Sequence, residues 1–120
     1  MTWQQKLQQP QWKAFRIELI IKHGPACDDC GTINPRSNVT GLDAHHCWYE
    51  HGKVPWEYPE NAFLILCRKC HGIRQKVHNS AQVVLGSYMR LLSVEQMKAL
   101  TFELVAKRTD LEQPAAFSFE

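Results

Sequence analysis

The chain has 120 residues and a formal net charge of +2, with 44% hydrophobic and 22% charged residues. This length and composition are ordinary for one soluble globular domain, and the weak positive charge neither requires nor excludes a polyanionic partner. The longest apolar runs are far too short to span a bilayer, and the N-terminus lacks the pattern of a signal peptide. We therefore expect a cytoplasmic protein of one domain, residues 1–120, with no membrane contact.

The first predicted element is a helix over residues 2–22. Trp12, Phe15 and Leu19 recur on one of its faces at helical spacing. Pro10 is expected to divide this region into a short first turn and a longer helix, because proline fits the first turn of a helix but not its interior. The Gly-Pro pair that follows ends the helix.

The middle of the chain predicts short strands and loops. Residues 26–42 are expected to form a Cys-x-x-Cys turn and a loop, and residues 39–49 a strand or hairpin arm. Residues 50–60 contain two prolines and a glycine and predict a loop, and residues 62–67 form a short apolar run. The aromatic residues here are expected to close a small core around the hairpin rather than stack on bases: Trp48, Tyr49, Trp56 and Tyr58.

The last third of the chain predicts helices. One helix is expected to start near Cys70, and a helical extension follows over residues 79–109. Ser93–Gln96 resembles a capping box that opens a helix to about Arg108. Residues 110–120 are expected to be a flexible tail.

Four of the five cysteines form two Cys-x-x-Cys pairs, Cys27 with Cys30 and Cys67 with Cys70. The two-residue spacer lets both sulfurs of a pair face inward, and four thiolates complete the tetrahedral coordination of a structural Zn²⁺. A redox dithiol is the alternative, and the presence of two pairs disfavours it. The odd fifth residue, Cys47, argues against a secreted disulfide framework.

Three histidines and an asparagine accompany these pairs. His45 and His46 lie between the two cysteine pairs, and His71 follows the last cysteine. Asn61 lies between His46 and the second cysteine pair. Neighbouring side chains of a strand point to opposite faces, so one histidine can hold a metal ion while the other faces a substrate. This set fits metal-assisted hydrolysis of a phosphodiester, in which a neutral imidazole accepts a proton from water and a divalent ion stabilises pentacoordinate phosphorus.

The order of His-His, Asn and Cys-x-x-Cys-His resembles the motif of the HNH endonucleases. The segments that resemble small stand-alone HNH proteins of bacteria and phages are 8–12, 42–46, 55–58 and 64–71. The resemblance covers about residues 3–78. It implies an α+β fold with a zinc-stapled ββα-metal, treble-clef-like core over about 24–78, an N-terminal helix and C-terminal helices.

The resemblance also implies a metal-dependent DNA endonuclease in a bacterial or phage-infected cell, and a role for each site residue. His46 is the general base that activates water, and His45 and His71 hold the catalytic divalent ion. Asn61 holds the two arms of the motif together or orients His46, and Asp43 is a second-shell partner for an imidazole. The products carry 5′-phosphate and 3′-hydroxyl ends.

The identity of the catalytic ion follows from one departure from the family pattern. Some relatives carry a further histidine four residues after the third motif histidine, where this chain has Gln75, with His78 further on. A histidine-rich site for Zn²⁺ or Ni²⁺ is therefore less favoured than one for Mg²⁺ or Mn²⁺.

Residues 61–94 contain no aspartate or glutamate, so the weak net charge conceals a local basic patch. The residues expected to contact DNA are Arg68, Lys69, Arg74, Lys76 and His78. Contacts of this kind are made to phosphates, so we expect low sequence specificity. A solvated helix face is the alternative.

Two other functions fit the same motifs. The first is a zinc module that binds nucleic acid without cleaving it. The second is a subunit of a larger phage packaging, restriction or defence complex, or a homodimer, joined through the C-terminal helices. That second function predicts an apolar face on residues 81–107 that the core does not cover.

Overall fold

The computed structural model describes residues 1–33 and 41–107, and the chain divides into two units, residues 1–74 and residues 75 onward. The described part combines α-helices with a two-stranded antiparallel sheet, and four cysteines lie close together. This arrangement is compatible with the expected α+β zinc-binding fold. The predicted tail lies outside the described residues.

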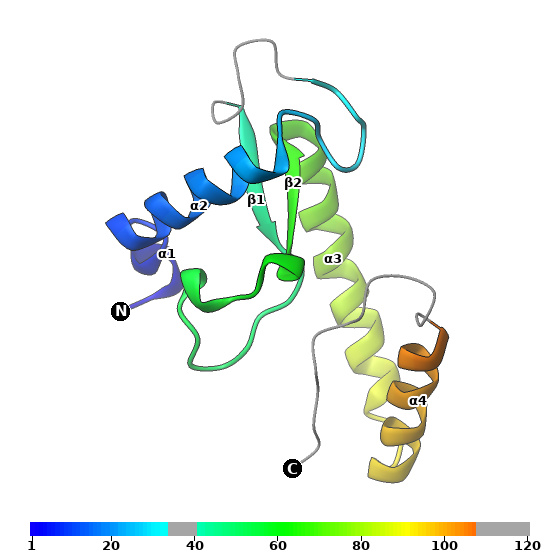
Figure 1. Ribbon diagram of the computed structural model, residues 1–120. Coiled ribbons are helices and arrows are strands. Elements are labelled where there is room, and N and C mark those ends of the chain that lie inside the picture. Colours follow the sequence, from blue (N-terminus) through cyan, green and yellow to red (C-terminus); the bar gives the residue numbers. More distant parts are fainter. Residues whose placement is uncertain (34–40, 108–120) are drawn as a thin grey trace. The chain divides into compact units, whose positions relative to one another are not determined.

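Two helices form the N-terminal region (Figure 1), α1 over Trp3–Lys6 and α2 over Pro10–His23. The side chain of Thr2 caps α1 in a capping box. Pro10 is the first residue of α2, and the helix ends at Gly24, whose φ of 97° is favourable only for glycine. The predicted division at Pro10 is therefore confirmed.

Strands β1 (Leu42–His46) and β2 (Phe63–Cys67) form an antiparallel hairpin, with Leu42 opposite Cys67 and His46 opposite Phe63. The described strand is shorter than the arm expected over residues 39–49. The loop between the strands is irregular, as its prolines predict, and contains short 3₁₀ helices at Pro55–Glu57 and Glu60–Ala62.

The two faces of the hairpin have different surroundings. Leu42, Ala44 and His46 alternate onto the face that packs on α2. The core on this side consists of Trp12, Leu19, Ile20, Leu42, Ala44, Tyr58, Ala62, Phe63 and Ile65. Trp48 and Trp56 are partly buried against it, whereas Tyr49 is exposed. The expected aromatic core is therefore confirmed at three of its four positions.

The first Cys-x-x-Cys turn pairs with the outer edge of β2. The backbone N–H of Asp28 donates to the carbonyl of Ile65 at 2.8 Å, and the Ile65 N–H donates to Asp28 Oδ2 at 2.7 Å. The other carboxylate oxygen of Asp28 lies 2.7 Å from His23 Nε2. Asp28 therefore satisfies both backbone groups of Ile65 on the edge of the two-stranded sheet.

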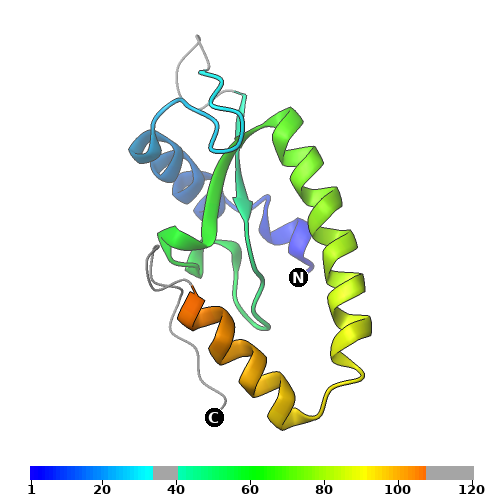
Figure 2. The same ribbon diagram turned by 90° about the vertical axis from the view of Figure 1, so that its right-hand side faces the viewer.

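Helix α3 spans Arg68–Met89 and starts directly after β2, two residues before the expected position. It is one continuous helix (Figure 2), so residues 79–89 continue the helix that carries His71. Helix α4 spans Val94–Lys107. Ser93 and Gln96 form the predicted capping box, with backbone-to-side-chain distances of 2.8 and 3.1 Å. No helix within residues 1–33 and 41–107 has the length and apolar character that crossing a bilayer requires.

Replacing Asp28 by alanine is expected to lower the free energy of unfolding of the zinc-loaded protein by about 1–3 kcal/mol, because it leaves the buried N–H of Ile65 without its acceptor. Asp29→Ala is the matched control. That carboxylate pairs with the partly exposed Arg74, so its loss should cost below about 1 kcal/mol. Denaturant unfolding at saturating zinc measures both variants, and equal losses would contradict the role assigned to Asp28.

Candidate functional site

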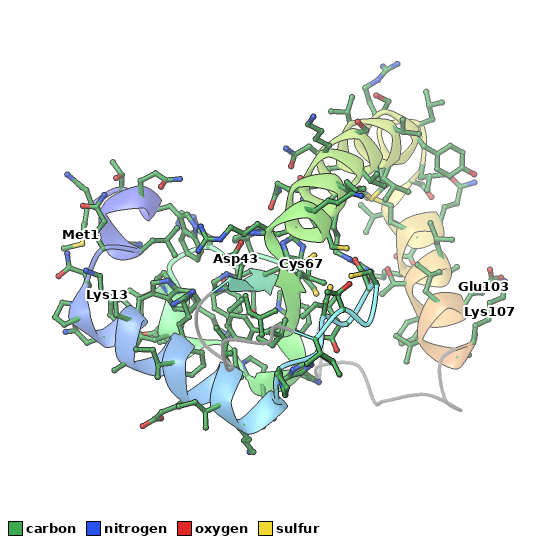
Figure 3. The ribbon with its side chains drawn as sticks, turned by 90° about the horizontal axis from the view of Figure 1, so that it is seen from above. Met1, Lys13, Asp43, Cys67, Glu103 and Lys107 are labelled. Atoms are coloured by element: carbon green, nitrogen blue, oxygen red, sulfur yellow. The ribbon has the colours of Figure 1, made fainter. Side chains whose placement is uncertain are left out.

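The side-chain sulfurs of Cys27, Cys30, Cys67 and Cys70 all lie within 4.8 Å of one another. A tetrahedral zinc with Zn–S bonds of about 2.3 Å places its sulfurs roughly 3.8 Å apart. The sulfurs of Cys30 and Cys67 are 3.9 Å apart, which fits this geometry. Figure 3 shows sulfur atoms gathered beside Cys67, with Asp43 on the neighbouring strand.

Local backbone structure brings the four cysteines together. Cys27 and Cys30 lie on a turn closed by a 2.9 Å bond from the Gly31 N–H to the Cys27 carbonyl, and Gly31 has the positive φ that such a turn requires. Cys67 ends β2, and Cys70 lies in the first turn of α3. The hairpin register and the start of α3 therefore determine where the second pair meets the first.

The thiols of this cluster titrate differently. Hydrogen bonds with Thr32, whose hydroxyl lies 3.1 Å from the sulfur, lower the pKa of Cys30 to about 6. Sharing of a proton with Cys67 raises the pKa of Cys70 to about 12. A metal ion such as Zn²⁺ binds the thiolate forms, so its binding would release the protons that the cluster still holds. Thr32 was not among the residues expected at this site, although a hydroxyl two residues after a cysteine is a recognisable signal.

The four cysteines are the only group of three or more metal-ligating side chains found together among residues 1–33 and 41–107. The chemistry of these donors suits a metal ion such as zinc, and four sulfurs leave no open coordination position for a reaction. A catalytic ion needs other ligands.

On the second face of the hairpin, Asp43, His45 and His71 lie together. Asp43 and His45 are two residues apart on β1 and share a face. The Nδ1 atom of His71 lies 3.0 Å from Asp43 Oδ2, and the ring centroids of His45 and His71 are 5.2 Å apart. His45 is buried, with 2% of its surface exposed, whereas Asp43 and His71 are half-buried. The structure therefore brings together the two histidines expected to hold the catalytic ion.

His46 occupies the opposite, core-facing side of β1, and only 4% of its surface is exposed. The aromatic rings with centroids 4.5–5.6 Å from its imidazole are those of Trp3, Trp12, Tyr49, Tyr58 and Phe63. The expectation that the adjacent histidines point to opposite faces is confirmed. The side chain of His46 is buried in the aromatic core. No pattern in the sequence predicts the contact with Trp3.

The imidazole of His46 makes a hydrogen bond of 3.1 Å between Nε2 and the carbonyl of Pro55. Because a carbonyl oxygen only accepts, Nε2 carries the proton and the lone pair of the neutral ring is on Nδ1. Burial lowers the pKa of His46, and the bond to Pro55 offsets only part of this effect. The ring is therefore neutral at pH 7.

Asn61 is exposed and lies in the short 3₁₀ helix that precedes β2. It precedes Phe63, the register partner of His46, by two residues. Asn61 is thus nearer to the His46 end of the hairpin than to the end that carries Cys67.

The basic residues expected to contact DNA all lie on α3, but their environments differ. Arg68 and Lys69 are exposed in the first turn of the helix. The guanidinium of Arg74 makes a bidentate pair with Asp29 at 2.8 and 2.9 Å. Lys76 and His78 follow on the same helix, where Lys76 is exposed and His78 is half-buried.

Removal of the metal is expected to unfold the first unit. A structural zinc contributes about 10–16 kcal/mol of binding free energy, which is comparable to the whole stability of a small domain of about 5–15 kcal/mol. Cys67→Ser should therefore abolish stoichiometric zinc binding, measured by elemental analysis, and eliminate the cooperative thermal transition followed by circular dichroism.

The control for this variant is Cys47→Ser, because Cys47 lies outside the cluster. It should retain one zinc per chain and a cooperative transition. Full zinc binding by Cys67→Ser, or loss of zinc from Cys47→Ser, would show that the wrong thiols have been assigned.

Comparison with known proteins identifies no relative: no family model matches the chain, and no curated protein and no solved structure matches it either. The chemistry of the chain's own residues is therefore the basis for a function.

Proposed function

We propose that this protein is a metal-dependent endonuclease of the HNH type that hydrolyses DNA phosphodiester bonds in the cytoplasm of a bacterial or phage-infected cell. Its fold is proposed to be a ββα-metal, treble-clef-like core stapled by zinc. One observation carries the proposal: His45 and His71 lie beside each other with Asp43. His45 and Asp43 are on β1, which pairs with the strand that ends at Cys67, and His71 follows Cys70 on α3.

His45 and His71 are proposed to hold the catalytic ion. Two imidazole ligands leave most coordination positions available for water and for phosphate oxygens, as a catalytic site requires. Mg²⁺ or Mn²⁺ is the proposed ion, and the nitrogen ligands also suit Zn²⁺ or Ni²⁺. When bound, a divalent ion supplies positive charge that stabilises the pentacoordinate phosphorus and the leaving oxygen.

His46 is proposed to be the general base. A water oxygen bonds to phosphorus while the imidazole lone pair takes the proton of that water. The bond between phosphorus and the 3′ oxygen breaks, and the 3′ oxygen takes a proton from solvent, which gives 5′-phosphate and 3′-hydroxyl ends. The lowered pKa of His46 supports this role, because the ring is neutral at pH 7. Asn61, near the same end of the hairpin, is proposed to orient it.

DNA is proposed to bind through its phosphates at the start of α3. Arg68 and Lys69 are exposed there and directly precede Cys70 and His71. Arg74 is engaged with Asp29, so a phosphate contact would have to compete with that ion pair. Lys76 and His78 extend the proposed contacts along the helix.

A non-catalytic zinc module that binds nucleic acid is the second candidate function. The observation that favours it is the enclosure of His46 by aromatic rings at 4% exposure, because a general base must reach a water molecule next to the substrate. In this alternative His46 is a packing residue of the core.

Association through the C-terminal helices is compatible with either function. Several large apolar side chains of this region are exposed: Val77, Val83, Val84, Leu85, Tyr88, Met89, Leu91, Val94, Phe102 and Leu104. An exposed apolar set of this size supports a homodimer or a larger protein complex.

Plasmid cleavage by three variants tests the nuclease and its base. His45→Ala and His71→Ala should lose cleavage supported by Mg²⁺ or Mn²⁺, and EDTA should abolish the activity of the wild type. His46→Phe retains an aromatic ring in the core but removes the proton acceptor, so cleavage should fall by about 10²–10⁴-fold with zinc content unchanged.

His51→Ala is the control for these variants, because His51 is exposed in the loop before Pro55. It should cleave at the wild-type rate. Full activity of His46→Phe would make His46 a packing residue, and no cleavage by the wild type with any of the four ions would favour the binding module.

DNA binding should depend on Lys69 through electrostatics. Lys69→Gln is expected to weaken binding of a short duplex without changing sequence preference, and to reduce the slope of log K against log salt by about 1. Lys13→Gln on α2 removes the same charge outside the proposed interface and should leave the slope unchanged. Fluorescence anisotropy over a salt series measures both, and equal slopes for the two variants would place the interface elsewhere.

A further inference from the structure

The five aromatic rings around His46 differ in how deeply they are buried. Three of them belong to the core and keep only 3–8% of their surface exposed: Trp12, Tyr58 and Phe63. The other two belong to Trp3, which is partly buried against the core, and to Tyr49, which is 47% exposed. Of the five rings, those of Trp3 and Tyr49 are therefore the ones that can move away from His46 without opening the core.

Trp3 meets both the imidazole and the exposed tyrosine ring beside it. The centroid of its indole lies 5.2 Å from that of His46 and 5.2 Å from that of Tyr49, with interplanar angles of 74° and 83°. Tyr49 is in turn stacked on His46, at a centroid distance of 5.6 Å and an angle of 26°. Each of the three rings therefore contacts the other two, and withdrawal of the indole would uncover His46.

Helix α1, which carries Trp3, is weakly anchored. It spans four residues, and none of them is buried. Its capping box consists of two local hydrogen bonds between the exposed residues Thr2 and Gln5, at 2.7 and 3.2 Å. A helix this short is not stable on its own, so α1 depends on the packing of Trp3 and Leu7 against the core. Local opening of such a segment costs much less free energy than unfolding the core.

The role proposed for His46 requires an opening of this kind. Its Nε2 atom is engaged with the carbonyl of Pro55, so the proton acceptor of the neutral ring is Nδ1. A general base must come within hydrogen-bond distance of the water molecule whose proton it takes. With 4% of its surface exposed, the ring meets little solvent while Trp3 rests against it. Lids that uncover a site by a conformational step solve this problem in many enzymes.

We propose that α1 is a lid over His46, with Trp3 as its contact residue. The imidazole is shielded while the indole rests against it and becomes open to water and substrate when α1 moves away. This inference rests on the proposed function, because a lid has a purpose only if His46 acts on a substrate. It differs from the alternative in which His46 is a packing residue, because Trp3 would then be a permanent part of the core.

The first test measures access to His46 by chemical modification of the zinc-loaded protein. Diethyl pyrocarbonate reacts with the unprotonated nitrogen of a neutral imidazole, and peptide mass spectrometry gives the rate at His46 relative to the exposed His51. Trp3→Ala should bring the rate at His46 close to the rate at His51. A wild-type ring as reactive as His51, or a relative rate unchanged in Trp3→Ala, would overturn the proposal.

Thr2→Ala tests the lid with the indole in place. It removes the cap of α1, and the relative rate at His46 should rise by about 2–30-fold, the range by which loss of a helix N-cap shifts a helix-opening equilibrium. Thr2 is exposed, so this variant keeps its core even if Trp3→Ala fails to fold. An unchanged relative rate in Thr2→Ala would contradict the lid.

Two further variants control for general loosening of the core. Trp3→Phe retains an aromatic ring over His46 and should stay close to the wild-type rate. Phe15→Ala removes another partly buried ring, one that packs on Trp12 and Phe63, and should leave the rate at His46 unchanged. Equal increases in Phe15→Ala and Trp3→Ala would assign the effect to the core and overturn the lid.

The second test follows the titration of His46 by NMR of its ring protons. Burial lowers the pKa of His46, so uncovering the ring in Trp3→Ala should raise its pKa toward the ordinary value of histidine. The ionisable side chains in ring contact with His46, Tyr49 and Tyr58, are retained in this variant. A pKa equal to that of the wild type would contradict the lid.

Plasmid cleavage separates the lid from the nuclease. If both proposals hold, Trp3→Ala should cleave faster than the wild type, because a larger fraction of the protein is in the open state. Raised reactivity of His46 in Trp3→Ala without cleavage by any variant supports the lid and contradicts the nuclease. Cleavage by the wild type with unchanged reactivity in Trp3→Ala supports the nuclease and overturns the lid.

Discussion

The meeting of four cysteine sulfurs within 4.8 Å is the constraint on which the rest of the first unit depends. It ties residues 27–30 to residues 67–70 and so closes a long loop that contains the hairpin. Hydrogen bonding moves the pKa values of Cys30 and Cys70 in opposite directions, and a metal ion such as zinc binds the thiolate forms and releases their protons. His71 directly follows Cys70, so it lies next to this cluster at the start of α3.

The alternation of β1 is the second constraint. His45 and His46 point to opposite faces of β1. The ring of His45 lies beside His71, and the ring of His46 lies among the aromatic residues of the core. Burial keeps His46 neutral, which suits both a proton acceptor and a core residue. The two candidate functions therefore differ in whether water and a phosphate can reach two buried rings, His45 at 2% exposure and His46 at 4%.

Much of the fold could be predicted from local signals. Pro10, the Ser93–Gln96 capping box and the Cys-x-x-Cys spacing act within a few residues, and the structure agrees with each of them. Features that depend on tertiary packing were less predictable from the sequence. The expected start of α3 near Cys70 was two residues late, because the helix continues directly from β2. The role of Asp28 at the edge of β2 had no sequence signal, because Ile65 is 37 residues away.

The sequence by itself determined the chemical inventory: a cysteine set suited to zinc, three histidines at motif positions and a stretch free of acidic residues. It also determined that the adjacent histidines separate, since this follows from the two-residue period of a strand. Only the tertiary structure decided which histidine the aromatic core encloses, that Asp43 bonds His71 and that Arg74 is paired with Asp29. The physical reason is that these contacts join residues 28 to 45 positions apart, and the hairpin register and the direction of α3 bring them together.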